Sequence, residues 1–184
     1  MSDVHGSIES GGRTYKIMYS LGVMERIQEK YGSFQTWADK LQVESEGAHA
    51  LAFGLSAMIE AGEGNPCSER KALKILAVGD STEIIKEVVE TISLSVRDEE
   101  ATVRLIPDEP DEEKSNFEWY KLIGTARLGY ATHSEVMAHT LTYFNRLYRA
   151  YQKLFDLESA LMMGEESYQS LEEKNENEEL WLPL

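Results

Sequence analysis

Large apolar side chains recur at helical intervals in the C-terminal part of the chain, between Phe117 and Met163. Their steps alternate between four and three residues, which places them on one stripe of a helix of about five turns. Such a broad and aromatic stripe has to be buried, against the short helix predicted for residues 117–128 or against another protein. The members of the stripe are Met137, Leu141, Phe144, Tyr148, Tyr151 and Phe155.

In the N-terminal part, apolar residues first recur at the two-residue period of a strand and then at the period of a helix. Residues 4–19 are predicted to form a β-hairpin, with a turn at Ser10-Gly11-Gly12, because glycine readily adopts positive φ. Tyr15, Ile17 and Tyr19 alternate with polar or flexible neighbours, as in a strand. The period changes at Ser20, which is placed to cap the first helix.

The rest of this part predicts about five short helices, beginning after Ser20, after Ser33, and near residues 48, 68 and 81. Gly32 fits the left-handed position beyond the first helix. The last of these helices is expected to end near Val96. Its expected buried face consists of Ile84, Ile85, Val88, Val89 and Ile92.

Two acidic segments divide the chain. Residues 97–116 hold eight acids and two prolines, and such a segment repels itself and has little apolar surface to bury. The sequence thus predicts a hairpin-plus-helix domain (1–96), an acidic linker (97–116), a helical C-terminal domain (117–163) and an acidic disordered tail (164–184). The predicted fold class is mainly α: an N-terminal β-hairpin, a bundle of about five short helices, the linker and a small helical C-terminal unit.

The net charge and the hydropathy of the chain argue against nucleic-acid binding and membrane insertion. The formal net charge of −15 opposes nucleic-acid binding, which needs clustered lysine and arginine. No apolar run approaches the roughly 20 residues that span a bilayer, so no membrane partner is expected. The N-terminus lacks the features of a signal peptide, and we expect a cytoplasmic protein.

The sequence shows no pattern of catalytic or metal-binding residues. None of the four histidines lies three or four residues from another histidine or from the cysteine, so no zinc site is predicted. Many carboxylates occur as runs in the predicted linker and tail, which offer neither the burial nor the close charged partner that a catalytic acid needs. We therefore expect no cofactor, no metal and no enzymatic activity.

The single cysteine, Cys67, has two interpretations. It is either an incidental residue in a turn or, beside the start of a helix at Ser68, a thiol of lowered pKa. The absence of a matching histidine or aspartate motif favours the turn residue.

Aromatic and basic residues interleave between Tyr143 and Lys153. Nucleic-acid stacking is one reading of this pattern. On a helix, however, the bases Arg146, Arg149 and Lys153 project away from the aromatic stripe, and a buried stripe with a basic outer face explains the pattern better.

A strand that runs Gly12-Arg-Thr-Tyr-Lys-Ile leads into a helix ending in Glu29-Lys-Tyr-Gly-Ser33. The second half contains the run Trp119–Tyr130, then Ser134-Glu-Val-Met137, Thr140 and Tyr148. In this order, with a linker between, these segments resemble the tail assembly chaperones of long-tailed bacteriophages. The resemblance covers most of residues 12–155, and its motifs consist of capping and core residues rather than catalytic ones.

The resemblance implies a cytoplasmic assembly factor that is absent from the finished virion. Such a protein binds the tape-measure protein through its upstream domain, keeps it soluble, and recruits tail-tube subunits through its downstream domain. Self-association is also compatible. The family often makes its two-domain form by ribosomal frameshifting, whereas this sequence is one continuous chain with a longer acidic end.

We expect the downstream unit to engage the tail-tube subunit through five aromatic residues. The alternative is that these residues only form the core of that unit, with contact then made by the basic face of Arg146, Arg149 and Lys153. The five aromatic residues are Trp119, Tyr120, Phe144, Tyr148 and Tyr151.

A different function class also fits the acidity. An acidic regulator could mimic nucleic acid and occupy a DNA-binding protein. A mimic needs ordered carboxylates on folded faces, whereas the densest acids here lie in the predicted linker and tail, which favours the chaperone.

Overall fold

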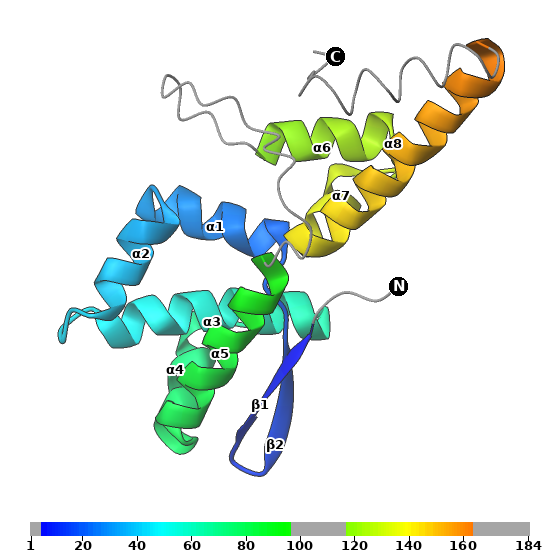
Figure 1. Cartoon of the computed structure of the whole chain (residues 1–184). Helices are drawn as coiled ribbons and strands as arrows, with labels where there is room; N and C mark the ends of the chain where they lie inside the picture. Colours follow the sequence, from blue (N-terminus) through cyan, green and yellow to red (C-terminus); the bar gives the residue numbers. More distant parts are fainter. Residues whose placement is uncertain (1–4, 97–116, 164–184) are drawn as a thin grey trace. The chain divides into compact units, whose positions relative to one another are not determined.

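A computed structural model describes the backbone of residues 5–96 and 117–163, and the side chains within these ranges as far as residue 155 (Figure 1). Its elements confirm the mainly helical fold with an N-terminal hairpin and five following helices. The predicted linker and tail lie outside the described residues. In chain order the elements are β1 (Gly6–Ser10), β2 (Arg13–Ile17), α1 (Leu21–Tyr31), α2 (Phe34–Leu41), α3 (Gly47–Glu63), α4 (Glu69–Val78), α5 (Ser81–Val96), α6 (Phe117–Ala126), α7 (His133–Met137) and α8 (Leu141–Met163).

The chain divides into two compact units, residues 1–145 and residues 146–184. The first unit contains the elements from β1 to α7 and the first turn of α8. The second contains the remainder of α8. The domain boundary predicted from the sequence falls in residues 97–116, so it stays a prediction.

The hairpin forms where the turn residues predict it. β1 and β2 pair antiparallel, with Ser10 opposite Arg13. The two intervening glycines, Gly11 and Gly12, have φ values of 59° and 75°, as a two-residue type I′ turn requires. Ile8 and Ile17 face the core. The chain then leaves β2 with the Met18 N–H donating to the Met58 carbonyl at 3.0 Å, which fixes the hairpin against α3.

Helix α3 forms the centre of the core of the first unit. Leu55, Met58 and Ile59 are each at most 1% exposed, and small residues let neighbouring helices approach closely. A side chain on Gly54 would place its Cβ 2.5 Å from Cζ2 of Trp37. The indole of Trp37 is held in this space by its Nε1–H, which donates to the Ala50 carbonyl at 2.9 Å.

The predicted helix boundaries at α1 and α2 are confirmed by their caps. The Ser20 hydroxyl accepts from the Val23 N–H at 3.3 Å, and the Ser33 hydroxyl accepts from the Thr36 N–H at 3.0 Å. Gly32 between the two helices has a φ of 81°. These local contacts satisfy amide groups that have no partner inside the helix.

The predicted buried face of α5 is only partly correct. Ile84 and Val88 are buried, but Ile85 is 45% exposed and Val89 is 56% exposed. The apolar residues of α5 span more of the helix circumference than the core covers. The buried row is completed instead by small polar residues, Thr91 and Ser95.

The prediction of one helix from Met137 to Phe155 is wrong. Met137 ends α7, and α8 begins at Leu141. The Thr140 hydroxyl accepts from the Tyr143 N–H at 3.3 Å, and the Thr140 carbonyl accepts from the Phe144 N–H at 3.0 Å. A threonine that bonds to the backbone in this way favours a new helix start over continuation of the preceding turn.

Candidate functional site

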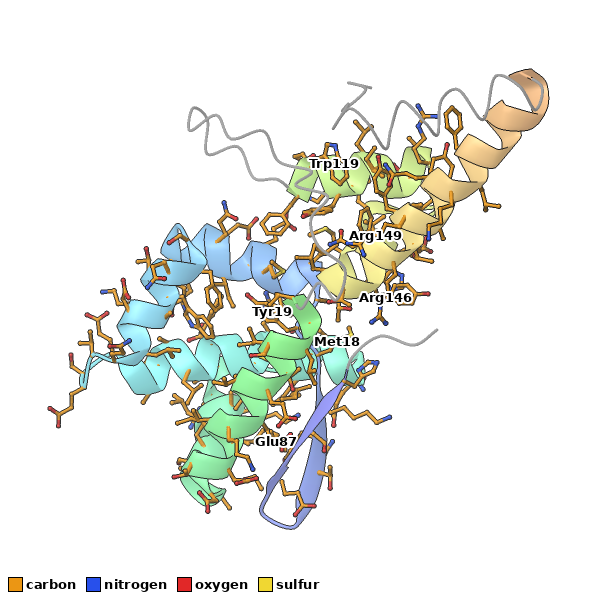
Figure 2. All side chains as sticks on the ribbon, viewed as in Figure 1. Met18, Tyr19, Glu87, Trp119, Arg146 and Arg149 are labelled. Carbon is orange, nitrogen blue, oxygen red and sulfur yellow. The ribbon has the colours of Figure 1, made fainter. Side chains whose placement is uncertain are left out.

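Three of the five predicted aromatic residues meet in the first unit. The ring of Tyr120 lies edge-on to that of Phe144 with centroids 5.2 Å apart, and Trp119 lies 5.3 Å from Tyr120 and 6.4 Å from Phe144. Phe144 is fully buried, whereas Trp119 (labelled in Figure 2) and Tyr120 are half-buried. Burial raises the pKa of the Tyr120 phenol. These contacts are those of a small aromatic core with part of its surface still accessible.

The other predicted residues lie on α8 within the second unit. Tyr148 is only 4% exposed, while Tyr151 is half-buried and its ring lies 6.4 Å from that of Phe155. Of the predicted basic face, Arg146 and Arg149 (Figure 2) are half-buried and Lys153 is exposed. A role of either set in binding a partner stays a prediction.

Helix α6 is joined to α1 by an ion pair within the first unit. Lys121 Nζ lies 2.7 Å from Glu25 Oε1 and 2.9 Å from Glu118 Oε1. The hydrogen bonds to Glu25 and then to Glu118 raise the pKa of Lys121. The ammonium group of Lys121 therefore holds α6 against α1 and is not a free reactive amine. A backbone hydrogen bond also holds the start of α1, where the Leu21 N–H donates to the His139 carbonyl at 2.8 Å.

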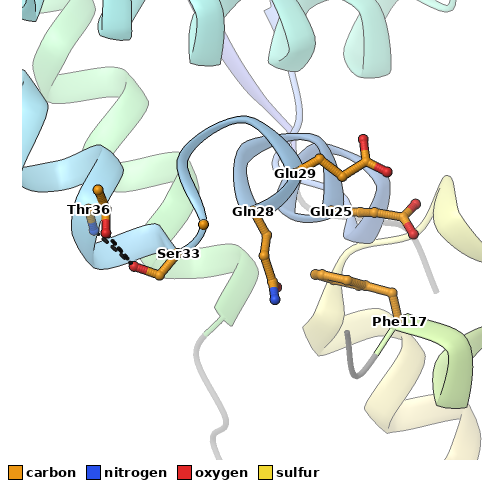
Figure 3. Close-up of a pocket in the computed structure, with 7 residues that line it drawn as sticks. Glu25, Gln28, Glu29, Ser33, Thr36 and Phe117 are labelled. Carbon is orange, nitrogen blue, oxygen red and sulfur yellow. Dashed lines mark hydrogen bonds between the residues drawn. The ribbon is translucent and has the colours of Figure 1, made fainter. Parts of the chain in front are cut away.

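A cavity of about 460 Å³ lies where α1, α2 and the start of α6 meet. Figure 3 shows Gln28 and Phe117 pointing toward each other across it. The hydroxyl groups of Ser33 and Thr36 are 2.9 Å apart and hydrogen-bonded at its edge. Its lining also contains the carboxylates of Glu25 and Glu29, and it contains no histidine, lysine or arginine.

A second cavity, of about 570 Å³, lies between β1 and the first turns of α5. It is lined by four carboxylates and by no lysine, arginine or histidine. Sequence reasoning missed this site, because the acids come from two separate elements and show no motif. Its lining consists of Ser7, Ile8, Glu9, Asp80, Glu83, Ile84 and Glu87.

Cys67 is a buried structural residue. It is 6% exposed, and burial raises the pKa of its thiol. The lowered-pKa interpretation is therefore wrong, because the nearby Lys71 lowers the pKa less than burial raises it.

An exposed apolar stripe runs along α5. It consists of Ile85, Val89, Ile92 and Val96, which are spaced four, three and four residues apart and so share one face of the helix. Ile85, Val89 and Val96 are 45%, 56% and 40% exposed, and Ile92 is half-buried. We call this set the α5 stripe. The sequence shows that the apolar face of this helix is wider than one core contact can cover. It does not show which part of that face stays exposed.

Within residues 5–96 and 117–155, no group of three or more histidine, cysteine or acidic side chains is arranged to hold a metal ion. Among the described helices, none is both long and apolar enough to cross a membrane. Comparison with models of known protein families, with curated protein sequences and with solved structures finds no match to this chain.

Proposed function

We propose that this protein is a bacteriophage tail assembly chaperone. It binds the tape-measure protein in the host cytoplasm, keeps that protein from aggregating, and brings tail-tube subunits to it, without entering the finished virion. It performs no catalysis. The proposal rests on the sequence resemblance and is supported by one structural observation, the α5 stripe.

The α5 stripe has the form that an apolar helical client requires. A helix that binds in a groove or against another helix makes its contacts at steps of three and four residues. Ile85, Val89, Ile92 and Val96 have this spacing. An exposed contiguous apolar surface on a folded protein generally marks an interaction site. A long, helical, aggregation-prone tape-measure protein is a client that would cover it.

The downstream contact is assigned to accessible side chains. Phe144 and Tyr148 are buried, so their substitution is expected to disturb packing. We propose that the tail-tube subunit is engaged by Arg146, Arg149 and Lys153, which share one face of α8 at steps of three and four residues. The buried aromatic residues hold this helix in shape.

Pull-down with purified full-length chain tests both contacts. We expect Ile85→Gln with Val89→Gln to lose the tape-measure protein and keep the tube protein. Glu90→Gln, another exposed position on α5, is the matched control and should keep both. Replacing Arg146, Arg149 and Lys153 by glutamine should release only the tube protein. Unchanged circular dichroism melts must accompany each loss, and retention of both partners by every variant would contradict the proposal.

The alternative, an acidic mimic of nucleic acid, is favoured by one observation. Glu9, Glu83 and Glu87 are ordered carboxylates on a folded surface. The neighbouring genes and the identity of the captured partner distinguish the two functions. A location beside tail-tube and tape-measure genes supports the chaperone, whereas capture of a DNA-binding protein that is lost with Glu83→Gln and Glu87→Gln supports the mimic.

A further inference from the structure

The outer edge of β1 carries backbone groups that the hairpin does not use. With a two-residue turn, Ser10 and Arg13 form a hydrogen-bonded pair, and hydrogen-bonded pairs then alternate along the ladder. Ile8 and Gly6 therefore bond to β2, while the N–H and C=O groups of Ser7 and Glu9 point away from it. Both residues are exposed.

The two edges of the hairpin differ in what covers them. On β2, α3 closes the edge at Gly62, where an added Cβ would lie 2.6 Å from the Lys16 carbonyl oxygen. On β1, an added Cβ at Gly79 would lie 3.1 Å from the Glu9 carbonyl oxygen, and α5 packs against Gly6, where an added Cβ would collide with the Thr91 hydroxyl. Within the described ranges, neither Ser7 nor Glu9 makes a backbone hydrogen bond outside the hairpin.

The β1 edge at Ser7 and Glu9 borders the cavity of about 570 Å³ between β1 and α5. Asp80 is occupied as a helix cap, since its Oδ1 accepts from the N–H groups of Thr82 and Glu83 at 2.9 and 3.3 Å. Glu83 is paired with Lys86 at 3.0 Å. The remaining two carboxylates, of Glu9 and Glu87, form no ion pair among the described residues.

We propose that the β1 edge binds an extended, basic peptide segment of a partner protein. The segment adds to β1 as a third strand, bonding to the free backbone groups of Ser7 and the N–H of Glu9. Lysine or arginine side chains at alternate positions reach the carboxylates of Glu9 and Glu87. The proposal does not depend on the chaperone function.

The charges argue for a basic partner over a second copy of this chain. Two β1 edges brought together would place Glu9 and Glu87 of each copy close to those of the other, and such edge charges oppose edge-to-edge pairing. A basic strand meets the same carboxylates as counterions. The contact is also separate from the α5 stripe, because Glu83 and Glu87 lie on the opposite flank of the buried row from Ile85 and Val89.

The test uses the full chain and a fluorescein-labelled peptide of alternating lysine and threonine, measured by fluorescence anisotropy. Ser7→Pro removes the outward N–H at an edge position where the hairpin does not need it. We expect an affinity loss of about tenfold relative to Ser7→Ala, which keeps that N–H. Glu9→Gln with Glu87→Gln should also weaken binding, whereas Glu90→Gln, outside the cavity, should not.

A measurement on the unmodified chain guards against a variant that fails to fold. Titration with the same peptide should shift the amide resonances of Ser7 and Glu9 in the nitrogen–proton correlation spectrum. Equal affinity of the Ser7→Pro and Ser7→Ala chains, with both amide resonances unmoved, overturns the proposal. Self-association of the unmodified chain that Ser7→Pro abolishes overturns it too, because a second copy is then the occupant.

Discussion

At the scale of single residues, Gly54 is a position in the core where a side chain has no room. Because a Cβ there would meet the indole of Trp37 at 2.5 Å, Gly54→Ala should force the core apart. Overpacking costs about 1–3 kcal/mol, of which better helix propensity returns up to about 1 kcal/mol. We expect a net loss of about 1–2 kcal/mol in the free energy of unfolding, measured in urea.

A second substitution controls for that prediction. In a chain that already carries Trp37→Leu, the smaller side chain leaves room for the added methyl group. Gly54→Ala should then cost clearly less than in the unmodified chain, since contacting residues are energetically coupled. Equal costs in both backgrounds would show that the indole is not what excludes a side chain at position 54.

Tyr19 predicts a dependence of stability on alkaline pH. It is 2% exposed, and burial raises the pKa of its phenol above the ordinary value of 10.0. Because the folded-state pKa is the higher one, its contribution is fully present below about pH 10 and is lost as the pH rises further. Tyr19→Phe should lose less stability than the unmodified chain between pH 9 and pH 11, measured by urea unfolding. An identical decline in both proteins would rule out this role.

Residue-scale features were the most predictable from the sequence. Ser20, Ser33 and Gly32 act within a few residues of themselves, so composition and spacing were sufficient to place them. Trp37 and Gly54 are a different case, because their fit depends on two helices that only the folded chain brings together. The raised pKa of Cys67 also depends on the folded chain, because burial raises this pKa more than the nearby Lys71 lowers it.

At the scale of whole elements, Thr142 joins the beginning of α8 to the end of α5. Its hydroxyl donates to the Ser95 carbonyl at 2.8 Å, with the Leu94 carbonyl at 3.3 Å. These carbonyls belong to the last described turn of α5. The contact therefore joins two helices that are distant in the sequence.

Thr142→Val should remove this hydrogen bond while it preserves the shape of the side chain. We expect a loss of about 1 kcal/mol in the free energy of unfolding, the usual net value of one buried hydrogen bond. Thr142→Ser keeps the hydroxyl and is the matched control, with a smaller loss expected in the same thermal or urea melt. A valine variant as stable as the serine variant would mean that the bond contributes nothing.

Element boundaries explain where prediction from the sequence succeeded and where it stopped. The five helices before residue 97 were located because each begins at a capping residue or ends at a glycine. The break between α7 and α8 was missed, because the apolar spacing continues through it and only the bonding of Thr140 reveals a new start. Which flank of α5 stays uncovered depends on neighbours in space, and periodicity carries no information about them.

At the scale of the whole molecule, most of the net negative charge lies outside the described residues. Residues 97–116 hold eight acids and three bases, and residues 164–184 hold seven acids and one base, so these segments carry eleven of the fifteen net negative charges. The remaining residues are therefore only weakly acidic. This distribution favours a chaperone whose charged segments keep a client complex dispersed over a mimic with phosphate-like charges throughout its folded surface.

Co-expression with the proposed client, the tape-measure protein, tests the central claim most directly. The measured quantity is the fraction of tape-measure protein in the supernatant after lysis and centrifugation. We predict that the unmodified chain and Glu90→Gln keep most of it in the supernatant, whereas Ile85→Gln with Val89→Gln leaves it in the pellet, as does omission of the chain. A tape-measure protein that partitions equally with and without this chain would contradict the account.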